Sequence, residues 1–191
     1  MVLFFQKIYA KIVLLLLVVQ QEMYIDVMED LYNLSIRARV AYGTMCLEAL
    51  LSKLGYELEE WDFILRRLWE YTSIKYLDDW HDMMAEYIPS SILDCPFEEG
   101  DYIKKEEYDF LSKLYRVKRE LCEVIELIFY VGTIELYSKV IKVGESMKHL
   151  EKIISIMNNN EMPLPEIGKL KDYSFSNKQG WGEIFEREEI M

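Results

Sequence analysis

Apolar residues recur at spacings of three and four along most of the chain, which is the pattern of amphipathic helices. The clearest stretch, residues 35–89, carries three of the four tryptophans. It predicts a helix over residues 35–54, with Ser35 as the N-cap and Gly55 as the residue that ends it. A second helix is predicted over residues 58–71, and a third from residue 77 to a stop at Pro89.

The second and third of these helices carry their apolar residues on one face and their charged residues largely on the others. In the third helix Leu77, Trp80 and Met84 follow helical spacing, while acidic side chains occupy the other faces. We therefore expect Trp80, and Leu68 of the second helix, in the core. We expect Asp79 and Glu86 on the surface.

The segments on either side give weaker patterns. Residues 23–34 predict a short helix, and residues 90–101 an exposed loop in which Asp101 caps the next helix. A helical pattern then runs over residues 102–143, which is too long for one ordinary helix, so we expect a break near Arg116 or at Gly132. Within it residues 125–131 predict the most buried helix. Residues 145–157 predict a last helix, ended by three asparagines.

Residues 161–191 predict an irregular tail, because Pro163 and Pro165 hold the chain extended and the helical pattern ends. Its aromatic side chains, above all Trp181 and Phe185, are too apolar for a free tail, and we expect them packed on the helices. The 191 residues fit one domain, and 8 Gly and 4 Pro leave few turns for a β fold. The prediction is an all-α, single-domain helical bundle with an irregular C-terminal tail packed on it.

Residues 1–22 stand apart from this pattern. Lys7 and Lys11 precede an apolar run of eight residues, 12–19. Such a run is shorter than the roughly 20 residues of a membrane-spanning helix, and no small residues for signal cleavage come after it. Three interpretations stay open, namely a buried first helix, a membrane-surface segment and an extension caused by a start assigned too early. None includes a stable membrane span.

The charge balance favours some partners over others. Lys and Arg number 22 against 34 Asp and Glu, which gives a net charge of −12. Such a surface repels nucleic acid and speeds encounter with a basic protein. Arg37 and Arg39 form no basic patch, and we interpret them as ordinary helix surface. The three cysteines, Cys46, Cys95 and Cys122, lack metal-binding spacing and fit free thiols in a reducing cytoplasm.

Candidate catalytic chemistry is sparse. Asp78, His81 and Asp82 fall on one helical face, where they could offer ligands to a divalent metal, but such a site needs further ligands from other elements. We interpret them as a solvated polar face, and the lone His149 as a surface or capping residue. The sequence contains no phosphate-binding loop, nucleophile elbow or HExxH motif. We therefore expect no enzyme and no cofactor.

Three groups of residues together resemble small helical immunity proteins of bacterial polymorphic toxin systems. They are Arg39-Val40-Ala41-Tyr42-Gly43 with Cys46-Leu47-Glu48, the series Trp61, Leu68-Trp69, Leu77-Asp78-Asp79-Trp80 and Pro89, and the tail Gly180-Trp181-Gly182 with Phe185. The resemblance covers most of the chain after Met23 and leaves out residues 1–22. It implies a cytoplasmic antidote that binds a cognate toxin domain and blocks it. The alternative is a helical regulatory or adaptor protein with an unrelated protein partner.

The resemblance carries over no binding residue, so the candidates come from the charge. A basic toxin domain would contact exposed carboxylates. These are Asp78, Asp79 and Asp82 on the third helix of the 35–89 stretch, and Glu98, Glu99 and Asp101 on the loop after it. The toxin's chemistry and the oligomeric state stay open.

Overall fold

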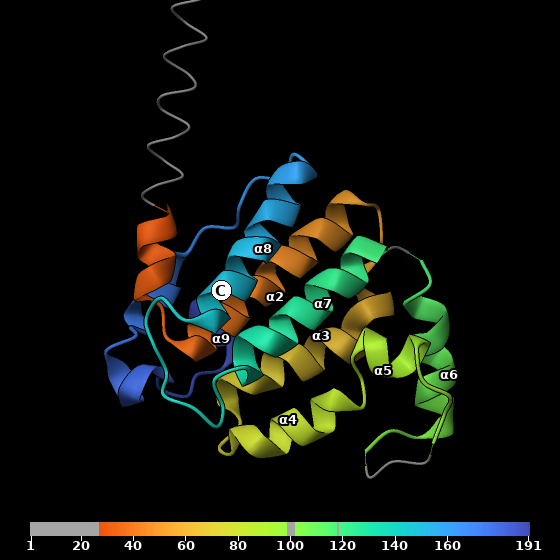
Figure 1. Ribbon diagram of the computed structural model, residues 1–191. Helices are drawn as coiled ribbons and strands as arrows, with labels where there is room; N and C mark the ends of the chain where they lie inside the picture. The colour runs from red at the N-terminus through yellow and green to blue at the C-terminus, as the bar shows by residue number, and fades with distance from the viewer. Residues whose placement is uncertain (1–26, 99–101, 118) are drawn as a thin grey trace, which may run out of the picture.

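The computed structural model describes residues 27–98, 102–117 and 119–191 (Figure 1). Helices dominate this described part, and no strand occurs in it beyond one isolated bridge between Leu34 and Ser174. The all-α prediction is therefore confirmed. The interpretations of residues 1–22 fall outside the described residues.

The helices succeed one another along the chain, and the longest connections precede α6 and α8. Residues 27–33 are helical, as the sequence predicts for this region. After them come α2 (Ile36–Lys53), α3 (Leu58–Ser73), α4 (Leu77–Ala85), α5 (Pro89–Leu93), α6 (Lys105–Leu114), α7 (Arg119–Thr133), α8 (Glu145–Asn159), the 3-10 helices η1 (Gly168–Asp172) and η2 (Asn177–Gly180), and α9 (Arg187–Ile190).

Helix α2 lies at the centre of the bundle. It packs against α3, α7 and α8, and these four helices run side by side in Figure 1, with α4 crossing at their lower end. Buried residues occur on every side of α2 from Ile36 to Gly43, as in a helix enclosed by its neighbours. The sequence had indicated residues 125–131 of α7 as the most buried stretch. That stretch does face the core, but Tyr130 remains 38% exposed.

The faces predicted for α3 and α4 are largely confirmed. Trp80 and Leu68 are fully buried and Asp79 is exposed. The prediction for Glu86 is wrong, since this residue is half-buried. Its carboxylate accepts hydrogen bonds from the backbone N–H groups of Tyr102 (3.1 Å) and Ile103 (2.8 Å), because the chain returns to the end of α4 before α6 begins.

Helix ends account for the other departures. The loop predicted over residues 90–101 includes α5, which starts at Pro89, because the fixed φ of proline suits the first turn of a helix. Helix α6 starts only at Lys105, so its N-cap is Lys104 and not, as the sequence predicts, Asp101. The Glu107 carboxylate accepts a hydrogen bond from the Lys104 N–H at 2.9 Å.

The long pattern over residues 102–143 is interrupted as expected near Arg116, between α6 and α7. Helix α7 ends at Thr133, next to Gly132, so the helical prediction for residues 134–143 is wrong. A Cβ on Gly132 would lie 2.8 Å from the Tyr71 ring, whose hydroxyl donates to the Gly132 carbonyl at 2.7 Å. Glycine therefore lets α3 approach the end of α7 closely.

The tail packs on the helices, as the sequence predicts. Phe185 is 1% exposed and its N–H donates to the Thr72 carbonyl at 3.1 Å, whereas Trp181 is half-buried. The three short helical turns η1, η2 and α9 within the tail were not predicted. Among the helices of the described residues, none has the length and apolar character needed to cross a membrane.

Candidate functional site

Two arginines of α2, Arg37 and Arg39, are buried rather than surface residues, which corrects the sequence interpretation. Arg39 is fully buried. Its guanidinium donates to the Ser146 hydroxyl at 2.9 Å and to the carbonyls of Lys142 (2.6 Å) and Tyr32 (3.2 Å). Burial lowers the pKa of Arg39 to about 10, and the nearby carboxylate of Glu135 opposes this shift. Arg39 thus fastens α2 to the α7–α8 connection.

Glu135 completes this buried cluster at the start of α8. Burial raises the pKa of its carboxyl, whereas the charge of Arg39 and backbone N–H donors of Ser146 and Glu145 lower it. A Cβ on Gly144 would lie 1.9 Å from a Glu135 oxygen, so only glycine allows the carboxylate to reach this helix end. The cluster therefore explains the geometry of this connection.

Arg37 occupies a different place, at the C-terminal end of α3. It is 5% exposed, and its guanidinium donates to the Tyr71 carbonyl and, at 2.8 Å, to the Ile74 carbonyl. The guanidinium carbon lies 5.8 Å from the centre of the Tyr71 ring. Its buried Nε has no hydrogen-bond partner in the described part of the chain. Burial lowers the pKa of Arg37, and the charges of Tyr71 and Glu183 oppose this shift.

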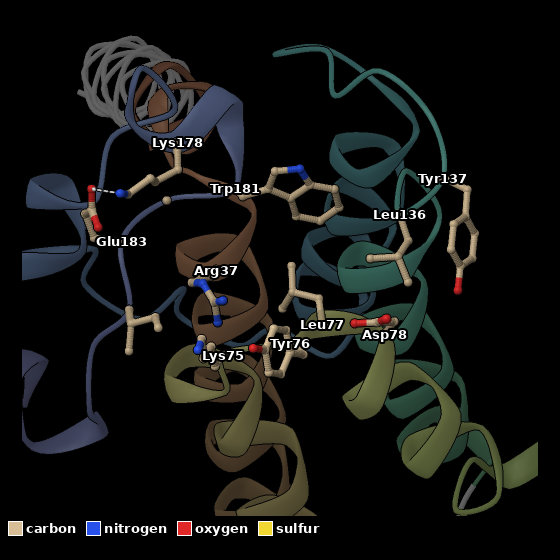
Figure 2. Close-up of a pocket in the computed structure, with 12 residues that line it drawn as sticks. Arg37, Lys75, Tyr76, Leu77, Asp78, Leu136, Tyr137, Lys178, Trp181 and Glu183 are labelled. Atoms are coloured by element: carbon tan, nitrogen blue, oxygen red, sulfur yellow. Dashed lines mark ion pairs between the residues drawn. The ribbon is translucent and has the colours of Figure 1, made fainter.

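Arg37 lies on the floor of a surface hollow of about 640 Å³, which we call the Arg37 groove (Figure 2). Four segments that are distant in sequence build it. They are Arg37 of α2, residues 75–78 at the start of α4, residues 136–137 after α7, and residues 178 and 181–184 of the tail.

The shape of the tail wall depends on unusual backbone. Lys178 and Gln179 have φ of 47° and 57°, in the left-handed region that non-glycine residues rarely adopt. Gly180 and Gly182 come next with φ of 99° and 86°. A Cβ on Gly182 would lie 2.2 Å from the Ser35 hydroxyl oxygen, so the Gly-Trp-Gly sequence lets the tail run against α2. The resulting turn places Trp181 over the groove (Figure 2).

Large side chains are exposed at the rim. Tyr137 is 82% exposed, Tyr76 is 55% exposed and Ile184 is 50% exposed. In Figure 2 Tyr137 lies to the right of the Trp181 indole, beyond Leu136, and Tyr76 lies below Leu77. Exposed aromatic side chains gathered around a hollow are typical of binding surfaces, because each buries a large area at low entropic cost.

The groove contains charges of both signs. The Lys178 ammonium lies 3.6 Å from the Glu183 carboxylate, and the Lys75 ammonium lies 4.9 Å from the centre of the Tyr76 ring. Asp78 adds a second carboxylate to the lining.

The structure divides the six acidic residues predicted to bind a partner. Asp78 lines the Arg37 groove, and Asp79 and Asp82 are exposed beside it on α4. Glu98 is exposed too, but it lines a second hollow of about 450 Å³ with Ala85 and Glu86, at the other end of α4. The two ends of this nine-residue helix are about 12 Å apart. Glu99 and Asp101 lie outside the described residues.

The metal interpretation gains no support from the geometry. Among the residues that the structure describes, no three His, Cys, Asp or Glu side chains are placed to hold an ion. The His81 ring stacks on Phe129 with centroids 5.6 Å apart, and its Nδ1 lies 3.0 Å from an Asp82 oxygen. His149 is not the surface or capping residue that the sequence suggests. It is half-buried and stacked on Tyr130, and burial lowers its pKa.

Sequence reasoning missed the groove residues Arg37, Tyr76 and Tyr137. One signal for Arg37 was available, since residues 36–43 of α2 are apolar apart from Arg37 and Arg39. No comparable signal marks Tyr76 or Tyr137, because each comes from a connection whose course depends on the whole fold.

The fold and this site define a helical protein with an aromatic-rimmed surface groove. Comparison with known proteins adds no relative, since no family model, curated protein or solved structure matches the chain.

Proposed function

We propose that this chain is an immunity protein that binds a cognate toxin domain of a bacterial polymorphic toxin system in the cytoplasm and neutralises it. The observation that supports the proposal best is the Arg37 groove with its exposed rim. Tyr137, Tyr76 and Trp181 are the side-chain types that dominate binding energy at protein interfaces. A binding function needs such a surface and no catalytic group.

The charge of the chain supports a basic partner. Asp78 and Asp79 lie in the first turn of α4, where the positive end of the helix dipole stabilises carboxylates. Neither forms an ion pair within the described part of the chain. Together with Asp82, they leave negative charge beside the groove that would raise the association rate of a basic toxin domain. Glu98, Glu99 and Asp101 remain candidates for a second contact.

Co-expression with the toxin domain encoded beside this gene tests the proposal. We expect cells that make both proteins to survive. Continued killing, although the antidote accumulates in folded form, would refute immunity and favour the alternative, a helical regulatory or adaptor protein with another protein partner.

Matched variants locate the contact. Tyr137→Ala should weaken binding to the toxin at least tenfold, because its ring is exposed before binding and free to be buried by a partner. Phe110→Ala is the control, since this aromatic ring is 44% exposed on α6, outside the groove. Asp78→Lys should slow association about tenfold at low salt, and less at high salt. If survival holds but neither variant changes binding, the contact lies outside the groove.

A further inference from the structure

The guanidinium of Arg37 has hydrogen-bonding capacity that the fold does not use. Arginine carries five N–H donors, and the side-chain hydrogen bonds of Arg37 to described residues go to the carbonyls of Tyr71 and Ile74. Nε is buried and has no hydrogen-bond partner among the residues that the structure describes. A buried donor without an acceptor costs free energy, so an acceptor brought by a ligand would be favourable here.

The groove reverses the charge balance of the protein. Acidic residues outnumber basic residues by 34 to 22 in the whole chain. The groove is lined by three cations, Arg37, Lys75 and Lys178, and by two carboxylates, Asp78 and Glu183. Glu183 pairs with Lys178, whereas neither Arg37 nor Lys75 forms an ion pair with any described residue. Arg37 and Lys75 both line the groove.

Apolar side chains form part of the walls around these cations. Trp181 covers the groove on one side, and Leu77, Leu136 and Tyr137 line the other (Figure 2). A volume of about 640 Å³ lies within the range of about 300–1,000 Å³ typical of small-ligand sites. Such a site combines apolar contact area with a few fixed polar groups that orient the ligand.

We propose that the Arg37 groove binds a carboxylate carried on an aromatic or aliphatic body. The carboxylate accepts from Arg37 and faces the Lys75 ammonium, and the apolar body packs between Trp181 and Tyr137. A planar guanidinium suits a carboxylate because two parallel N–H···O bonds can form. The group comes either from a free small carboxylic acid or from an acidic side chain of a peptide. This inference does not depend on the proposed immunity function.

Nuclear magnetic resonance titration of the full chain tests the site. N-acetylphenylalanine supplies a free carboxylate, and N-acetylphenylalanine amide is its neutral match. We expect the acid to shift the Trp181 indole N–H and Arg37 Nε–H signals saturably, and the amide to bind at least tenfold more weakly. Equal binding of acid and amide, or no shift with the acid at 10 mM, would overturn the proposal. The variant Trp181→Phe assigns the indole signal.

A peptide with blocked ends and an internal Glu-Phe pair distinguishes the two sources. Tighter binding of this peptide than of the free acid assigns the site to an acidic segment of a protein. Tighter binding of the free acid assigns it to a small metabolite.

Charge variants complete the test. Arg37 also holds the end of α3, so Arg37→Lys can disturb folding. Lys75 is exposed, so Lys75→Gln removes its charge and its contact with the Tyr76 ring without opening a cavity in the core. We expect Lys75→Gln to weaken binding of the acid at least threefold, and Lys113→Gln, an exposed lysine of α6, to leave it unchanged. Equal affinity of Lys75→Gln and the wild type would refute the site, whatever the co-expression assay gives.

Discussion

Replacing Trp80 by alanine should be among the most destabilising single changes in this protein. The indole is fully buried on α4 and connects three helices. It meets the Tyr71 ring of α3 edge-on with centroids 4.8 Å apart and stacks near Phe129 of α7 at 6.0 Å. Its Nε1 donates to the Arg67 carbonyl at 2.7 Å.

The magnitude can be worked from these contacts. Truncating a buried tryptophan to alanine costs about 3–5 kcal/mol, from lost apolar burial and from the cavity that remains. In a protein of this size each kcal/mol lowers the melting temperature by about 2–4 °C, so Trp80→Ala should lower it by about 6–20 °C. Trp80→Phe keeps an aromatic ring in place, so it should lose less than half as much free energy of unfolding as Trp80→Ala. Tyr137→Ala is the control, because its 82% exposed ring should contribute less than about 0.5 kcal/mol.

Urea unfolding followed by circular dichroism measures the free energies, and thermal melts give the midpoints. A Trp80→Ala protein that melts within 2 °C of the Tyr137→Ala control, with an unchanged urea slope, would show that the indole is not part of the core. A changed slope would instead indicate a change in the compactness of the unfolded or native state, or a loss of two-state unfolding, so the slope must be compared before the free energies.

Thiol reactivity, pH, a backbone change and a shorter chain each give a further test. Cys95 is exposed whereas Cys46 is buried and burial raises its thiol pKa, so a thiol reagent should label Cys95 first and Cys46 only after unfolding. Burial raises the pKa of Tyr71, so its contribution to stability is complete below about pH 10 and lost as pH rises above it. Urea unfolding between pH 8 and 11 should show a falling free energy of unfolding. In Tyr71→Phe this free energy should fall less steeply with pH. Gln179→Gly should raise stability by up to about 1 kcal/mol in a thermal melt, because glycine adopts a φ of 57° without strain; a lower melting temperature would contradict this. A chain that starts at Met23 should melt at the temperature of the full chain, and insolubility of the shortened chain would show that residues 12–19 belong to the core.

Much of the helical architecture could be predicted from apolar spacing alone. Helices α3, α4 and α8 each bury one stripe, so their pattern identifies both the helix and its face. Helix α2 behaves differently, since it is enclosed on all sides and two of its buried residues are arginines. A pattern that assigns polar residues to the surface necessarily misplaces them. Their burial depends on carbonyls of Tyr71, Ile74 and Lys142, which only the folded chain brings within reach.

The Arg37 groove could not be predicted for a related reason. Its walls come from segments separated by more than 140 residues, and the tail wall contains a left-handed turn at Lys178 and Gln179. Neither residue type indicates such a turn. The neighbouring Gly180-Trp181-Gly182 sequence did single out this part of the tail. It did not indicate that this part forms a wall of the groove.

Backbone hydrogen bonds hold the tail wall of the groove in place. The Ser35 N–H donates to the Tyr173 carbonyl at 2.9 Å, and the Arg37 N–H donates to the Trp181 carbonyl at 3.2 Å. Phe185 fixes the far end of the wall through its bond to Thr72. Because Trp181 is held from both sides, a partner that buries it need not order the tail first. Binding to a preformed surface avoids that entropic cost, so the affinity of the groove depends mainly on the new contacts that its occupant makes.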